Sequence, residues 1–168
     1  MLKHIKYYFL ISVSFLFLLP YCKEVEKVPE TPKIEYLGER VVDTLDALGN
    51  TATRIDLEVY LVDGDGNIGL FSYDTISPND TSKFYITEFR KEDGIFVEQY
   101  YEQALHYRLP YLQPQGQDKT LRCTIRVELF YNEPQLLEMD SIQYKLFVVD
   151  RSGKKSNTIT TPEIILPN

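Results

Sequence analysis

Strict alternation of apolar and polar residues from Thr120 to Tyr131 constrains the fold of this chain more than any other feature. The positions predicted to point inward are Leu121, Cys123, Ile125, Val127 and Leu129, and those predicted to point outward are Arg122, Thr124, Arg126 and Glu128. Because successive side chains of a β-strand point to opposite faces, a period of two predicts a half-buried strand. An amphipathic helix would need an apolar period near 3.6 residues.

Shorter alternating segments predict further strands. They span residues 54–62, 83–89, 95–99, 140–149 and 156–166. Asp93-Gly94 separates two of them and is typical of a tight hairpin turn, because both residue types tolerate positive φ. Pro162 favours an edge position for the last strand. Several strands separated by turn residues, without useful helical periodicity, predict an all-β antiparallel sandwich.

Tyr144 stands near the start of the penultimate predicted strand and has two interpretations. Sandwiches often place a corner tyrosine there, whose hydroxyl bonds back to the chain. A tyrosine that simply packs in the core fits the same position.

The N-terminal segment has the layout of a lipoprotein export signal. Lys3 and Lys6 precede an apolar stretch over residues 7–19, and Cys22 follows shortly after it. About 13 apolar residues are too few to span a bilayer but suit the core of a signal peptide. We therefore expect a signal peptide over 1–21, lipidation of Cys22, a tether over 22–32 and one domain over 33–168. An uncleaved anchor and a plain secreted form remain the alternatives.

The net charge limits the molecules that the chain can bind, and the cysteine content limits the disulfides that it can form. The chain carries 18 basic and 25 acidic residues, a net charge of −7, and loss of Lys3 and Lys6 with the leader would bring it to −9. Such an acidic protein is poorly suited to bind nucleic acid or an anionic bilayer surface directly. Because Cys22 is the expected lipid site, Cys123 has no disulfide partner within the chain, so packing rather than a disulfide must stabilise the domain.

The loop Asp63-Gly64-Asp65-Gly66-Asn67 presents side-chain oxygens at every second residue, and Asp74 follows seven positions later. Calcium prefers six to eight oxygen ligands, so Asp63, Asp65, Asn67 and Asp74 are candidate metal ligands. An EF-hand loop has glycine at its sixth position, where this chain has Ile68. The other interpretation is a tight turn in which the Asp-Gly pairs supply left-handed backbone geometry.

Four tyrosines crowd one short stretch: Tyr100, Tyr101, Tyr107 and Tyr111. Exposed tyrosines stack on sugar rings or anchor protein interfaces, because they combine rigid area with a polar tip. The alternative is that they are strand residues packing the sandwich.

We identify no catalytic set in the sequence. His106 is the one histidine after the leader, so a histidine cluster for zinc is excluded. The alternation places Cys123 on the apolar face, where a thiol is typically inert. We therefore expect no enzymatic activity.

Four fragments together resemble a family. They are Pro32 to Glu35, Val62 to Gly69 (VDGDGNIG), Tyr107 to Pro110, and Val149 to Gly153 (VDRSG) with Ser156-Asn157. In this order and spacing the chain resembles a group of Bacteroidota lipoproteins with an immunoglobulin-like or fibronectin-like sandwich. The resemblance implies that fold and a cell-surface or outer-membrane location, and it implies no activity.

The sequence thus predicts a lipid-anchored, non-enzymatic interaction or accessory module of the cell envelope. Its expected partners are the membrane, through the lipid on Cys22, and an outer-membrane protein. The alternative is a surface lipoprotein that binds a glycan or another small ligand through the tyrosine-rich stretch. The only cofactor the sequence suggests is calcium.

Overall fold

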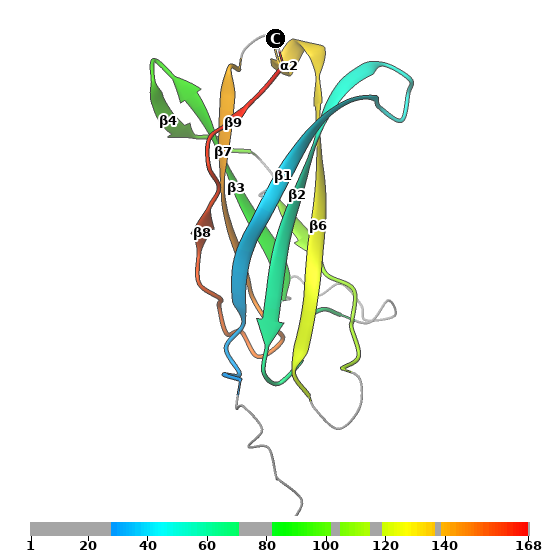
Figure 1. Cartoon of the computed structure of the whole chain (residues 1–168), viewed down its shortest axis with the longest axis vertical. Coiled ribbons are helices and arrows are strands. Elements are labelled where there is room, and N and C mark those ends of the chain that lie inside the picture. The colour runs from blue at the N-terminus through cyan, green and yellow to red at the C-terminus, as the bar shows by residue number, and fades with distance from the viewer. Residues whose placement is uncertain (1–27, 71–81, 102–104, 115–118, 137–138, 168) are drawn as a thin grey trace, which may run out of the picture.

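The computed structural model describes residues 28–70, 82–101, 105–114, 119–136 and 139–167, and it consists of two antiparallel sheets packed face to face (Figure 1). The first sheet contains β1 (Lys33–Leu45), β2 (Thr51–Asp63) and β6 (Leu121–Asn132), in the order β1-β2-β6. β2 is therefore hydrogen-bonded on both sides, over twelve residue pairs with each neighbour.

The second sheet runs in the order β4-β3-β7-β8, and its strands are β4 (Ile95–Glu98), β3 (Lys83–Glu92), β7 (Ser141–Val148) and β8 (Ile159–Thr160). The short strands β5 (His106–Arg108) and β9 (Ile164–Ile165) pair with β3 and β7, and the four-residue helix α2 (Glu133–Leu136) follows β6. The chain crosses between sheets from β2 to β3, from β5 to β6 and from β6 to β7, as in immunoglobulin-like sandwiches. The predicted all-β sandwich is confirmed.

The core fills the space between the two sheets. Ile55, Leu57, Val59 and Leu61 of β2 are completely buried, and Phe84 of β3 and the β7 residues Tyr144 and Leu146 are completely buried as well. β6 follows the predicted alternation, with Val127 and Leu129 buried and their polar neighbours exposed. The period of two in the sequence therefore matches the alternation of inward-facing and outward-facing side chains in β6.

A charged group lies inside this core. Glu88 of β3 is only 2% exposed, and its carboxylate accepts hydrogen bonds from the hydroxyls of Tyr101 (2.7 Å) and Tyr131 (2.8 Å) and from Arg90 Nε (2.8 Å). The Tyr131 and Tyr144 hydroxyls lie 2.6 Å apart. Burial, with Tyr144 and Glu88 alongside, raises the pKa of Tyr131 well above its usual value. Because Tyr131 belongs to β6 and Glu88 to β3, this network connects the two sheets.

The network also decides between the two interpretations of Tyr144. Its ring is completely buried and its hydroxyl pairs with Tyr131, so it is a core tyrosine. Among the described residues, no backbone group bonds its hydroxyl, so the corner-tyrosine interpretation has no support in the structure.

The structure tests two local predictions, the Asp93-Gly94 hairpin and the last strand. Asp93 and Gly94 both have positive φ (49° and 82°), which confirms the predicted hairpin between β3 and β4. The single strand predicted over 156–166 is wrong, because β8 and β9 are separate. Pro162, which has no N–H to donate, lies between them, and the Thr161 hydroxyl accepts a hydrogen bond from Tyr144 N.

β1 was not predicted from the sequence. A register shift opposite β2 between Tyr36 and Gly38 interrupts its alternation, as a β-bulge does. β1 is also an edge strand, so many of its side chains are exposed on both faces. A period-two pattern cannot reveal a strand with these two properties.

Gly69 and Gly153 have nearly the same backbone conformation (φ 80° and 81°) but different surroundings. A Cβ on Gly69 would overlap the carbonyl of Pro110, whereas a Cβ on Gly153 would meet no atom within 4 Å. Alanine at either site carries the cost of a left-handed φ, about 1–2 kcal/mol. We expect Gly69→Ala to lower the free energy of unfolding by at least about 1 kcal/mol more than Gly153→Ala, because only the former overpacks. If chemical denaturation showed the same loss of unfolding free energy for both variants, it would contradict the close approach of Pro110 to Gly69.

Candidate metal centre

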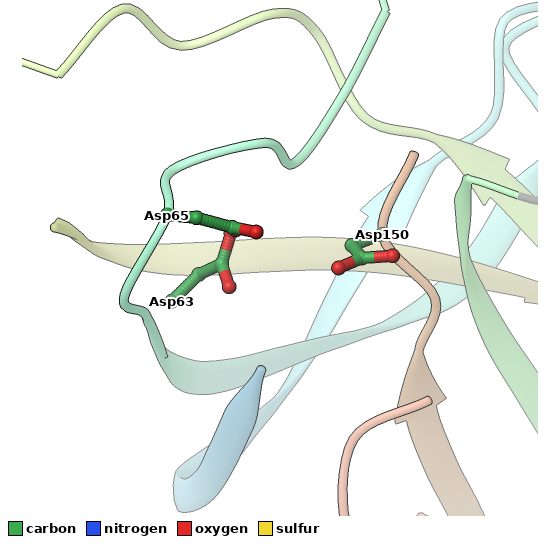
Figure 2. Close-up of side chains that lie close together, drawn as sticks. All are labelled: Asp63, Asp65 and Asp150. Carbon is green, nitrogen blue, oxygen red and sulfur yellow. The ribbon is translucent and has the colours of Figure 1, made fainter. Parts of the chain in front are cut away.

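Three aspartates meet at the end of the sandwich where β2 and β7 finish. Asp63 is the last residue of β2, Asp65 lies in the turn that follows it, and Asp150 comes two residues after the end of β7. One carboxylate oxygen from each lies within 4.8 Å of the other two. Figure 2 shows Asp63 and Asp65 side by side, with Asp150 facing them from the other strand end. The cluster therefore bridges the two sheets.

The turn after β2 is held by its own polar groups. Asp63 Oδ2 accepts a hydrogen bond from Asn67 N (2.9 Å), and Asp65 Oδ2 accepts one from Asn67 Nδ2 (2.9 Å). Gly64 N donates to Pro29 O (3.0 Å), and a Cβ on Gly64 would collide with the backbone at Val28 and Pro29. The second Asp-Gly glycine of the predicted turn, Gly66, has the expected positive φ of 63°.

The loop after β7 is fixed against this turn. Arg151 Nε donates to Asn67 O (2.9 Å), and Ser152 Oγ accepts from Asn67 Nδ2 (2.9 Å). Lys154 N donates to Asp150 Oδ1 (2.7 Å). The two contacts with Asn67 join residues more than 80 positions apart in the sequence, so the cluster exists only in the folded chain.

The electrostatic environment of the cluster is unusual. Asp63 and Asp150 are both completely buried. Burial raises the pKa of Asp63 to about 7, and the neighbouring Asp65 and Asp150 carboxylates act in the same direction. The Lys154 ammonium group lies 3.4 Å from Asp65 Oδ2 and 2.8 Å from Glu30 Oε2. Closely spaced carboxylates of this kind are stabilised by a bound cation or by a retained proton.

The structure brings together three of the four metal ligands predicted from the sequence, namely Asp63, Asp65 and Asn67. Asp74 lies outside the described residues. Asp150 was not predicted as a ligand, although the sequence singled out the turn to which it belongs. The available signal was that two aspartate-containing turns, VDGDG and VDRSG, each follow a buried strand.

The four tyrosines of the predicted ligand site have different surroundings. Tyr100 is 88% exposed, whereas the Tyr101 hydroxyl bonds Glu88. The Tyr111 ring lies under the guanidinium of Arg151, 4.9 Å from ring centroid to Cζ. Tyr107 lines a pocket of about 530 Å³ between β5 and β6. The four side chains thus contact different groups of the protein, and a ligand-binding role for them stays a prediction.

Cys123 and His106 are not assembled as a nucleophile pair. Cys123 is half-buried and lines the same pocket as Tyr107, and burial raises the pKa of its thiol. A raised pKa lowers the thiolate fraction and therefore the reactivity. His106 lies on β5 with its ring near that of Tyr85, and no hydrogen bond joins it to Cys123.

Comparisons with family models, with curated proteins and with solved structures found no match. The resemblance to Bacteroidota lipoproteins therefore stays a prediction. So does lipidation, because Cys22 lies outside the described residues. Within the described part of the chain, no helix is long and apolar enough to cross a membrane.

Proposed function

We propose that this protein is a lipid-anchored, non-enzymatic interaction module of the cell envelope, held at the outer membrane through Cys22. The observation that carries the proposal is that the two ends of the sandwich, along its long axis, differ from each other. Residues 28–32 precede β1 at the end of the sandwich where β2 finishes (Figure 1), and Gly64, next to Asp63 of the aspartate cluster, donates its N–H to Pro29 O. A module tethered there presents its opposite end to other molecules.

We call that opposite end the distal end. It carries exposed apolar side chains from three separate segments of the chain. Leu48 lies in the β1–β2 turn and is 87% exposed, Ile95 begins β4 and is 69% exposed, and Ile165 of β9 is 75% exposed. Aliphatic side chains this exposed contribute nothing to the core and favour contact with a partner when several share one end of a domain. A protein of the outer membrane is the partner we expect.

The proposal is tested by isolating the tagged full-length protein from detergent-solubilised membranes of its host. We expect a stoichiometric partner to co-purify with the native protein and to be lost with the double variant Leu48→Glu, Ile95→Glu, because buried charges at an interface are costly. The control is Leu112→Glu, which alters an exposed leucine that lies near Leu61 and Ile68 toward the tethered end and should retain the partner.

Two results would contradict the proposal. Isolation of the native protein alone would argue against an interaction module and would direct attention to glycans and other small ligands. Equal capture by the distal variant and by the native protein would show that the distal end is not the contact surface.

A further inference from the structure

We infer that Asp63, Asp65, Asn67 and Asp150 form a calcium site that fastens the two sheets together at the tethered end. The inference is independent of the proposed envelope function, since it rests on the oxygens of these four side chains. It does not require Asp74.

Each of the four side chains leaves one buried oxygen without a hydrogen-bond partner. These oxygens are Asp63 Oδ1, Asp65 Oδ1, Asn67 Oδ1 and Asp150 Oδ2. Buried polar atoms are nearly always hydrogen-bonded, so four unpartnered oxygens at one place require an explanation. Asp63 and Asp150 are themselves completely buried, so bulk water does not solvate them.

The remaining polar atom of each side chain is bonded to the protein. Asp63 Oδ2 binds Asn67 N, Asp65 Oδ2 binds Asn67 Nδ2, and Asp150 Oδ1 binds Lys154 N. The Asn67 amide likewise directs its N–H groups toward Asp65 and Ser152. Every candidate ligand is thus oriented by an outer contact while its other oxygen stays available, which is the arrangement found around protein metal sites.

The spacing and chemistry of these side chains fit calcium. Ligands that bind one Ca²⁺ at about 2.3–2.6 Å lie at most about 5 Å apart, and one carboxylate oxygen from each of the three aspartates lies within 4.8 Å of the other two. Carboxylate and amide oxygens are hard ligands suited to Ca²⁺, whereas zinc prefers the sulfur and nitrogen ligands that are missing from this cluster. Mg²⁺ demands a stricter octahedron and retains most of its waters, so a mostly protein-built set favours calcium.

The same loops hold the N-terminal segment in place. Gly64 N donates to Pro29 O, and Lys154 Nζ contacts both Glu30 and Asp65. Farther along, the Asn157 amide exchanges two hydrogen bonds of 2.9 Å with the backbone N and O of Ile34. A cation that fixes the two loops therefore also fixes the point at which residues 28–34 join the domain.

The inference is tested with the full chain, purified in detergent and freed of metal by chelation. Isothermal titration with Ca²⁺ should show saturable binding with one ion per chain. The melting temperature should rise by several degrees at saturating Ca²⁺, because a ligand that binds only the folded state stabilises it. An equal concentration of Mg²⁺ should give a smaller rise.

Asp150→Asn is the informative variant, because it keeps the side-chain shape and the acceptor for Lys154 N. We expect at least about a tenfold loss of Ca²⁺ affinity, since even the loss of an outer-shell partner typically costs tenfold to a hundredfold. In chelator, however, Asp150→Asn should melt no lower than the native protein, because it relieves repulsion among the three carboxylates. That result separates loss of the site from a failure to fold.

Asp46→Asn is the matched control. Asp46 also organises a turn, bonding Leu48 N and Asn50 N, but it lies at the distal end. This variant should retain the full Ca²⁺ response. The inference is overturned if millimolar Ca²⁺ produces neither heat nor a melting shift in the native chain, if Mg²⁺ stabilises it more than Ca²⁺, or if Asp150→Asn binds Ca²⁺ as tightly as the native protein.

Discussion

Replacing Glu88 with alanine is expected to lower the free energy of unfolding by about 3–5 kcal/mol, the range for removing one partner of a buried ion pair. The substitution removes the acceptor for Arg90 Nε and for the hydroxyls of Tyr101 and Tyr131. Arg90 is itself largely buried, with 17% of its side chain exposed, so its charge is only partly solvated after the change. Chemical denaturation followed by tyrosine fluorescence measures the loss.

The matched control is Glu58→Ala in the other sheet. Glu58 also pairs with an arginine, Arg126, but on the outer face, where the two side chains are 39% and 57% exposed. Exposed ion pairs contribute about 0–1 kcal/mol, so this variant should lose no more than that. Similar losses for the two variants would show that the Glu88 network does not stabilise the fold as its burial indicates.

The stability of the metal-free protein is expected to fall as the pH rises from about 5 to about 7. The pKa of Asp63 is raised by burial to about 7 in the folded chain from its ordinary value of 3.8. Between these two values the folded state retains a proton that the unfolded state has lost, so raising the pH favours unfolding. The slope approaches about 1.4 kcal/mol per pH unit and levels off above the folded-state pKa. The neighbouring Asp65 and Asp150 carboxylates also raise the pKa of Asp63.

Denaturation midpoints of the chelated full chain at a series of pH values measure this slope. Asp63→Asn removes the titrating group, so its stability should be nearly independent of pH over the same interval. Added Ca²⁺ competes with the proton, and its stabilising effect should therefore grow as the pH rises. A chelated native chain whose stability rises across this interval would contradict the assigned environment of Asp63.

The part of the fold that the sequence predicts is the part in which burial follows a simple period. β6 was expected over residues 120–131 and lies at Leu121–Asn132, because its inner face packs on the core and its outer face meets water. β1 could not be recognised, since its bulge near Gly38 and its edge position disrupt that period. The Asp93-Gly94 hairpin was predictable because positive φ restricts the residue types that can form it.

The candidate metal site was predictable only where its residues are neighbours in sequence. Asp63, Asp65 and Asn67 follow one another at the spacing of a ligand loop, so local pattern was sufficient. Asp150 reaches the site because β2 and β7, in different sheets, end at the same place, and that coincidence depends on the whole topology. The role of Glu88 could not be predicted for a related reason. Its hydrogen-bond donor from the other sheet, Tyr131, is 43 residues away in the sequence.

The long pairing of β1 with β2 has a mechanical consequence for a protein held by its N-terminus. A pull on the segment that precedes Lys33 acts along the axis of β1, so it loads the twelve pairs between β1 and β2 in shear and at the same time. Hydrogen bonds stretched together resist force better than bonds opened one after another. If the protein is tethered and bound as proposed, this pairing would keep the domain folded while a partner at the far end pulls against the tether.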